Sequence, residues 1–207
     1  FDGHLAVNLV RGNTSSCAEV KGINVPYNSS LIGAISNLGG IKAFLPLFEI
    51  IDIANNNING ESNSDLLINI LDILLSLNQS SEDFEIEFCK SNGISAFAHA
   101  FSKISKSTID KFVFSALHNF YLTFRNEVNQ VDFLRKFWFN YNVWDQMNLE
   151  QHQYLLTICL KPLLSNNENL FKQYISFPFL ISILKEIPDD SIRELYFTFI
   201  EFCSRHY

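Results

Sequence analysis

Cysteine and histidine stand three residues apart at the C-terminal end of the chain, at Cys203 and His206. On a helix this spacing places a thiolate and an imidazole on one face, and both groups are zinc ligands. A structural zinc site normally takes four ligands, and the sequence has no second pair at ligand spacing. The pair therefore predicts no metal site.

Cys89 and His99 could act together as a nucleophile and its general base. Cys89, however, stands beside Ile86 and Phe88 in an apolar helical pattern, where a buried thiol is inert. The sequence also has no GxSxG, HExxH, phosphate-loop or dinucleotide-binding motif. We therefore expect no catalytic residues and no cofactor site, and we expect Cys89 to pack in the core.

Four carboxylates cluster at Glu82, Asp83, Glu85 and Glu87. A calcium loop would need alternating oxygen ligands and a central glycine, which this segment lacks. Acidic residues at the start of a helix are explained by the positive end of its dipole. The cluster predicts a helix N-terminus.

Large aromatic rings crowd into the stretch "FLRKFWFNYNVWDQ", next to two basic residues. Exposed aromatic rings beside arginine are typical of protein-protein hot spots. The alternative is that the rings fill a junction between helical repeats of different length, because most such rings lie in the core. If the chain has a partner surface, we expect it here, at Arg135, Lys136, Trp138, Tyr141 and Trp144.

The composition of the chain bounds its class. Its 207 residues are 47% hydrophobic, 14% aromatic and 18% charged, which predicts a folded protein with a sizeable core. The net charge of -7 argues against nucleic acid or an anionic membrane surface as the direct partner. The apolar stretch "LLINILDILLSL" is interrupted by Asn69 and Asp72, so no segment is long enough to insert into a membrane.

The number and spacing of the cysteines indicate the redox state of the compartment in which the protein works. Cys17, Cys89, Cys159 and Cys203 lie far apart in a chain too large to need disulfides, which indicates reduced thiols in a cytoplasmic protein. The sequence begins with Phe1 rather than Met, so we expect a fragment of a longer protein.

The chain divides into two parts by its pattern of residues. Residues 1–29 lack helical periodicity: "GHLAVNLV" alternates like a strand and "VPYNSS" carries turn residues, so we expect an extended lead-in. From residue 30 the pattern is helical, beginning with a short helix in "SLIGAISN" that Gly39 and Gly40 end.

The next helix carries apolar residues on nearly every side, and we expect it to be almost wholly buried. Ile41, Phe44, Leu45, Phe48 and Ile51 share one face, which Leu47 and Ile50 widen. Pro46 stands either in the first turn of this helix or at a kink.

The pattern of a glycine followed by a wide apolar helix then repeats. It returns at Gly93 in "NGISAFAHAF", and a fainter copy carries Pro178 near the place of the glycine. Between the copies the periodicity predicts helices in "SNSDLLINILDILLSLN", in "SSEDFEIEFCKSN" with Ser80 and Asp83 as a capping box, and at about 108–127 and 150–165. A last helix opens at Asp189 or Asp190.

These repeats predict an all-α fold, an armadillo/HEAT-like α-solenoid over residues 30–207 with the extended lead-in at 1–29. Each unit buries its apolar face only against its neighbours, so the array extends and offers a long concave surface for binding.

The order of the segments "GNTSSCAEV", "SLIGAISNLGGIKAFLPLFEIID" and "SNSDLLINILDILLSLNQSSEDFEIEFCKSNGISAFAHAF" resembles the helical-repeat region of neurobeachin-type BEACH proteins. The later "FNYNVWDQMNLEQHQYLLTICLKPLLS" is similar to a family stretch in which a tryptophan, here Trp144, opens a helix. In that family the region resembles an armadillo array just after a concanavalin-like lectin module and well before the pleckstrin-like, BEACH and WD-repeat modules.

The resemblance implies a segment of a large cytoplasmic scaffold that acts in vesicle traffic and membrane dynamics, peripheral to intracellular membranes through its other domains. It implies no enzymatic activity, and as partners other proteins and the flanking modules of the same chain. Two alternatives remain open at this point: an armadillo adaptor unrelated to BEACH proteins, and a cysteine- or metal-dependent enzyme on a helical frame.

Overall fold

The computed structural model describes residues 17–20, 23–26, 40–53, 63–90 and 92–206. The first two ranges are antiparallel strands, β1 (Cys17–Val20) and β2 (Ile23–Pro26), with Cys17 opposite Pro26. Both are extended, as expected for the lead-in. The strand pattern expected at residues 3–10, the short helix at 30–37 and the boundary near residue 29 lie outside the described residues, so the division at 29 stays a prediction.

All other described elements are helical. In chain order they are the 3-10 helix η1 (Gly40–Ala43), α3 (Leu45–Ile53), α4 (Asn63–Ser80), α5 (Glu82–Lys90), α6 (Gly93–Ser102), the 3-10 helix η3 (Lys106–Thr108), α7 (Lys111–Leu122), α8 (Glu127–Phe133), the π-helical η4 (Leu134–Trp138), α9 (Tyr141–Trp144), α10 (Leu149–Tyr154), the π-helical η5 (Leu155–Leu160), α11 (Lys161–Asn166), α12 (Glu168–Tyr174), α13 (Phe177–Glu186) and α14 (Asp190–His206).

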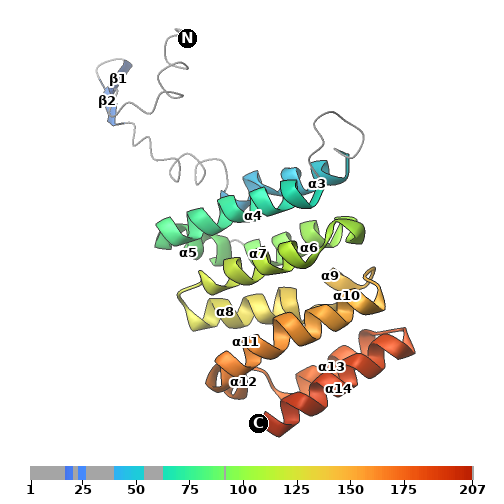
Figure 1. Ribbon diagram of the computed structural model, residues 1–207. Helices are drawn as coiled ribbons and strands as arrows, with labels where there is room; N and C mark the ends of the chain where they lie inside the picture. The colour runs from blue at the N-terminus through green and yellow to red at the C-terminus, as the bar shows by residue number, and fades with distance from the viewer. Residues whose placement is uncertain (1–16, 21–22, 27–39, 54–62, 91, 207) are drawn as a thin grey trace.

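The helices stack in two layers (Figure 1). One layer holds the long helices α4 and α7, the continuous run α10–η5–α11, and α14, each against the next. The other layer holds α3, α5 with α6, α8 with η4 and α9, and α12 with α13. The long helices begin at residues 63, 111, 149 and 190, so the described part contains four helical units that recur every 38 to 48 residues. The predicted α-solenoid is confirmed.

The long helices run parallel. Near their C-terminal ends, the side-chain amide of Asn78 in α4 donates to the hydroxyl of Thr123 after α7 at 2.8 Å. In the N-terminal halves, the ring of Tyr154 contacts Phe114 of α7, and His152 contacts Tyr196 of α14. Successive units therefore repeat in direction as well as in length.

The sharp turn between α5 and α6 requires a glycine at residue 93. Asn92, just before it, adopts the left-handed conformation with φ of 57°. A β-carbon on Gly93 would lie 2.2 Å from the carbonyl oxygen of Phe88 and 2.9 Å from the Cγ2 atom of Ile41. Only glycine lets the two helices approach this closely, as the sequence pattern predicted.

The helix after Gly40 is less buried than expected. Ile41, Phe48 and Ile51 are in the core, but Leu47 and Ile50 are exposed. The expectation of an almost wholly buried helix is wrong because α4, α6 and η1, which pack against α3, leave Leu47 and Ile50 uncovered. Pro46 lies in the first turn of α3, where its missing N–H costs nothing.

Two helix boundaries also differ from the predicted ones. The helix expected at about 108–127 ends at Leu122, because Asn126 caps a new helix, α8, by accepting from the amide of Val128. The cap of α5 is Ser81, which accepts from the amide of Phe84 at 3.3 Å, and not Ser80. The last helix is capped by Asp189, one of the two residues expected.

Candidate interaction surface

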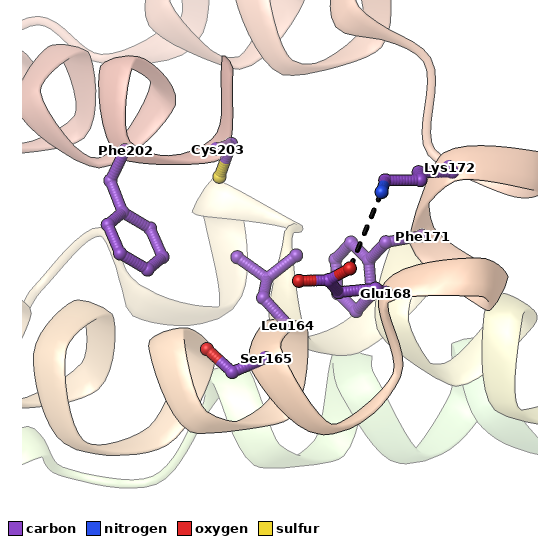
Figure 2. Close-up of a pocket in the computed structure, with 7 residues that line it drawn as sticks. All are labelled: Leu164, Ser165, Glu168, Phe171, Lys172, Phe202 and Cys203. Atoms are coloured by element: carbon purple, nitrogen blue, oxygen red, sulfur yellow. Dashed lines mark hydrogen bonds and ion pairs between the residues drawn. The ribbon is translucent and has the colours of Figure 1, made fainter. Parts of the chain in front are cut away.

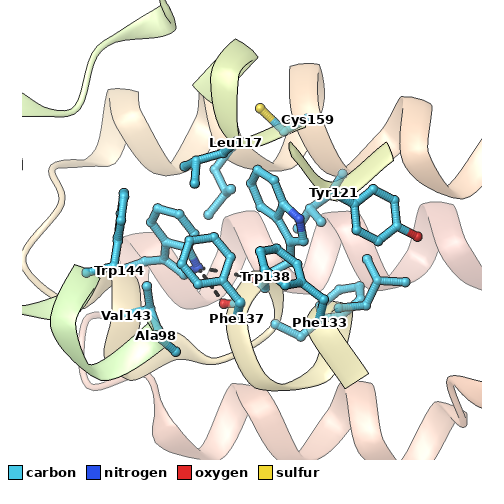
Figure 3. Close-up of a cluster of buried hydrophobic side chains, with 14 of the residues drawn as sticks. Ala98, Leu117, Tyr121, Phe133, Phe137, Trp138, Val143, Trp144 and Cys159 are labelled. Carbon is cyan, nitrogen blue, oxygen red and sulfur yellow. Dashed lines mark hydrogen bonds between the residues drawn. The ribbon is translucent and has the colours of Figure 1, made fainter. Parts of the chain in front are cut away.

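The aromatic residues that were predicted to form a partner surface lie in the core. Trp138 and Trp144 are fully buried and Tyr141 is 4% exposed. Figure 3 shows both indoles packed among Leu117, Phe133 and Phe137. The expectation that these three side chains are exposed is wrong, and they fill the junction between units instead.

Local geometry explains why the rings turn inward. The segment Leu134–Trp138 is π-helical, with the amide of Phe139 donating to the carbonyl of Leu134 at 2.8 Å. The indoles of Trp138 and Trp144 stack at 5.8 Å, and the indole N–H of Trp144 donates to the carbonyls of Phe137 and Trp138 at 3.1 and 3.2 Å. Both tryptophan rings therefore already contact apolar groups of this chain, and neither is available to a partner as a hot-spot ring would be.

The two basic residues of the predicted surface do reach the solvent. The guanidinium of Arg135 donates to the carbonyl of Tyr174 and lies 5.8 Å from the ring of Phe179. Lys136 forms an ion pair with Asp132 at 2.7 Å. Lys136 also lines an open hollow of about 210 Å³ between α6, η4 and α9. That either residue contacts a partner stays a prediction.

The described thiols are held in the protonated form. Burial raises the pKa of Cys89, Cys159 and Cys203 to about 12, and the charge of Glu85 adds to the shift at Cys89. Among the described residues no three His, Cys, Asp or Glu side chains converge in a way that could hold a metal ion. His99 is exposed while Cys89 is half-buried.

Cys203 faces a narrow apolar notch rather than a second set of ligands (Figure 2). The notch lies between α11, α12 and α14, with Phe171 and Phe202 on its walls and the ion pair of Lys172 with Glu168 across its mouth. Its volume of about 10 Å³ leaves room for about one water molecule at most. The notch is part of the packing between the last two units.

His152 is a buried titratable group that the sequence pattern did not reveal. It stacks on Tyr141, and its Nδ1 atom lies 3.4 Å from the hydroxyl of Tyr196. Burial lowers the pKa of His152 to about 4, against the smaller opposing effect of Asp189 and Asp145. The imidazole is therefore neutral in the folded protein near pH 7.

A second open hollow, of about 540 Å³, lies where α5, the start of α8 and the end of α12 meet. These three helices follow one another along one edge of the array in Figure 1. The hollow therefore touches three successive units.

Glu85 connects the parts of the inner wall of this hollow by hydrogen bonds. Its side chain is almost fully buried and accepts from the amides of Arg125 and Asn126 at 3.0 and 3.2 Å and from the side-chain amide of Asn129 at 2.8 Å. The guanidinium of Arg125 lies 3.7 Å from the same carboxylate and donates to the carbonyl of Gln79. Glu85 thus joins α5 to the turn before α8.

The acidic cluster was the signal in the sequence that marks this region. It was interpreted only as a helix N-terminus, and α5 does begin at Glu82. Periodicity alone could not show that Glu85 turns inward to hold the next unit, because its partners lie about forty residues away in the chain.

Comparison with known families decides the identity of this array. A family profile described as the neurobeachin/BDCP, DUF4704 alpha solenoid region matches residues 11–186. The chain belongs to this family. No curated protein and no solved structure matches it. Within the described part of this neurobeachin/BDCP solenoid, no helix combines the length and the apolar character that crossing a bilayer requires.

Proposed function

We propose that this chain is a non-catalytic interaction segment of a large BEACH-family scaffold that acts in vesicle traffic and membrane dynamics. The observation that carries the proposal is the match of the neurobeachin/BDCP solenoid region to residues 11–186, on a chain that folds as stacked helical units. Arrays of this kind present extended surfaces to other proteins and hold flanking modules at a set distance.

The state of the cysteines supports a role without catalysis. A nucleophilic cysteine needs a lowered pKa, whereas burial raises the pKa of all three thiols whose surroundings are described. This disfavours the alternative of a cysteine-dependent enzyme, and the family match disfavours an adaptor unrelated to BEACH proteins.

The partners in this proposal are other proteins and the flanking modules of the same chain, in the cytoplasm. The net charge of -7 disfavours nucleic acid and anionic lipid as direct partners. Attachment to intracellular membranes would come from other modules.

Proximity labelling in cells tests the proposal. The full-length protein that carries this segment is compared with a version in which the segment is replaced by an unrelated helical array of equal length. We expect the replacement to lose a defined set of neighbours that includes proteins of vesicle traffic, because the surface that binds them is gone while the spacing is kept.

An unchanged set of neighbours after replacement would overturn the interaction role and leave only that of a spacer. Alkylation of the purified chain at pH 7 tests the enzyme alternative, because an activated thiol reacts quickly in the native state. We expect native Cys89, Cys159 and Cys203 to react far more slowly than the unfolded chain.

A further inference from the structure

The hollow at α5, α8 and α12 has an apolar surface that nothing in the described structure covers. Ile86 of α5 is 38% exposed and Val128 of α8 is 60% exposed, and both line the hollow together with half-buried Tyr174. Aliphatic groups exposed in a concavity lose contact with water when a partner side chain fills it, which favours binding.

Carboxylates surround this apolar surface. Glu82 and Glu127, the first residues of α5 and α8, line the same hollow and are exposed. Among the described residues neither carboxylate has an ion-pair partner. Arg125 is the one cation among the described residues that line the hollow, and it is already held by Glu85 and by the carbonyl of Gln79. The positive ends of α5 and α8 offset only part of the charge of these two carboxylates, so the rim carries an excess of negative charge.

We propose that this hollow docks a basic, amphipathic peptide segment of a partner protein, with an aliphatic side chain on Ile86 and Val128 and lysine or arginine side chains beside Glu82 and Glu127. The inference deepens the proposed function, because it names the chemistry of a partner for an interaction segment. Charge complementarity selects the occupant: an acidic peptide or a phosphate-bearing ligand would meet the rim carboxylates and be repelled.

The preformed wall favours this use of the hollow. The Glu85 contacts fix the start of α8 relative to α5, so Val128 and Ile86 are held in place before a partner arrives. Binding then costs little ordering of the protein.

Fluorescence anisotropy with the purified chain and a labelled peptide tests the proposal. The probe has two leucines flanked on each side by lysines, and the comparison peptides replace lysine by glutamate or leucine by serine. We expect the lysine-leucine peptide to bind, with weaker binding as salt rises, and both comparison peptides to bind at least about tenfold more weakly.

Variants of the hollow locate the binding. The double variant Ile86→Ser with Val128→Ser should weaken binding of the lysine-leucine peptide about tenfold. The double variant Glu82→Gln with Glu127→Gln should slow association and flatten the salt dependence. Matched controls elsewhere on the surface are Leu149→Ser with Ile158→Ser and Glu150→Gln with Glu194→Gln, all at exposed positions, and they should bind as the parent does.

Equal binding of the glutamate-leucine peptide, no binding of any peptide, or unchanged binding by the hollow variants would overturn the inference. Circular dichroism establishes that each variant is folded before it is compared. This test is separate from the test of the proposed function. If replacing the whole segment loses neighbours in cells but the hollow binds no peptide, the interaction role stands and this binding site does not.

Discussion

The aromatic segment from Phe133 to Trp144 and the hollow beside Glu85 are opposite in composition and in position. The first has the rings that are typical of binding surfaces, yet its tryptophans are fully buried. The second is lined mainly by aliphatic, carboxylate and amide side chains, with Arg125 and a single ring, Tyr174, yet it is open over three units. In a stacked array, large rings are needed to fill the junctions between units, so residue type alone does not locate the surface that is left for partners.

The largest effect should come from the aromatic segment. Trp144→Ala removes a buried indole that stacks on Trp138 and donates to two carbonyls, so we expect a loss of about 3–5 kcal/mol in the free energy of unfolding. Urea denaturation followed by circular dichroism measures it. Phe197→Ala, at an exposed ring of α14, is the control and should change little. A small loss in the free energy of unfolding for Trp144→Ala would contradict the burial of this indole and favour an exposed ring.

Glu85 should rank second. Glu85→Ala leaves the amides of Arg125 and Asn126 without their acceptor, and we expect a loss of about 2 kcal/mol. The exposed neighbour Glu82 gives a matched control in Glu82→Ala, since its carboxylate, on the same helix, forms no ion pair with the described residues. Equal unfolding midpoints in urea for the two variants would show that Glu85 does not join the units.

His152 should make stability depend on pH. Its pKa is about 4 in the folded chain and about 6.5 when unfolded, so the unfolded chain binds more protons between these values. The contribution of the neutral His152 to the free energy of unfolding is fully present above about pH 6.5. It is about 1 kcal/mol smaller at pH 5.5, and it stops falling below about pH 4. Urea titrations at several pH values measure the slope.

A His152→Gln variant should lose this part of the slope, while His99→Gln, at an exposed position, should keep it. If both variants keep the slope of the parent chain, the buried imidazole is not its source.

The smallest effect on stability should come from the hollow. Ile86→Ser and Val128→Ser each change an exposed side chain, so we expect the free energy of unfolding to move by no more than about 0.5 kcal/mol. The same urea titrations serve as the measurement. A loss comparable to that of Trp144→Ala would mean that these side chains belong to the core and are not available to a partner.

Much of the architecture could be predicted from the sequence because it depends on local patterns. The apolar face of Ile94, Phe97 and Phe101 and the glycine before it set both the helix α6 and its sharp entry. Where the prediction failed, the cause was a contact between distant segments. The exposure of Ile50 depends on which helices lie beside α3, and periodicity does not contain that information.

The candidate surface was harder to predict for the same reason. The inward turn of Trp138 depends on the π-helical segment that begins at Leu134, and no propensity scale separates such a segment from an ordinary helix. The hollow is assembled from α5, α8 and α12, which are brought together only by stacking. The acidic cluster pointed to the right helix, but the contacts that give it a role lie in the next unit.

The parallel course of the long helices has an electrical consequence. Each helix carries about half a negative charge at its C-terminal end, and α4, α7 and α11 all end on the edge where α5, α8 and α12 follow them. The helices α5, α8 and α12 begin at the same edge, so their positive N-terminal ends lie beside these negative ends and the dipoles of the two layers largely cancel. The array therefore has little net dipole across its width, and the charge that a partner meets at this edge comes from side chains such as Glu82 and Glu127.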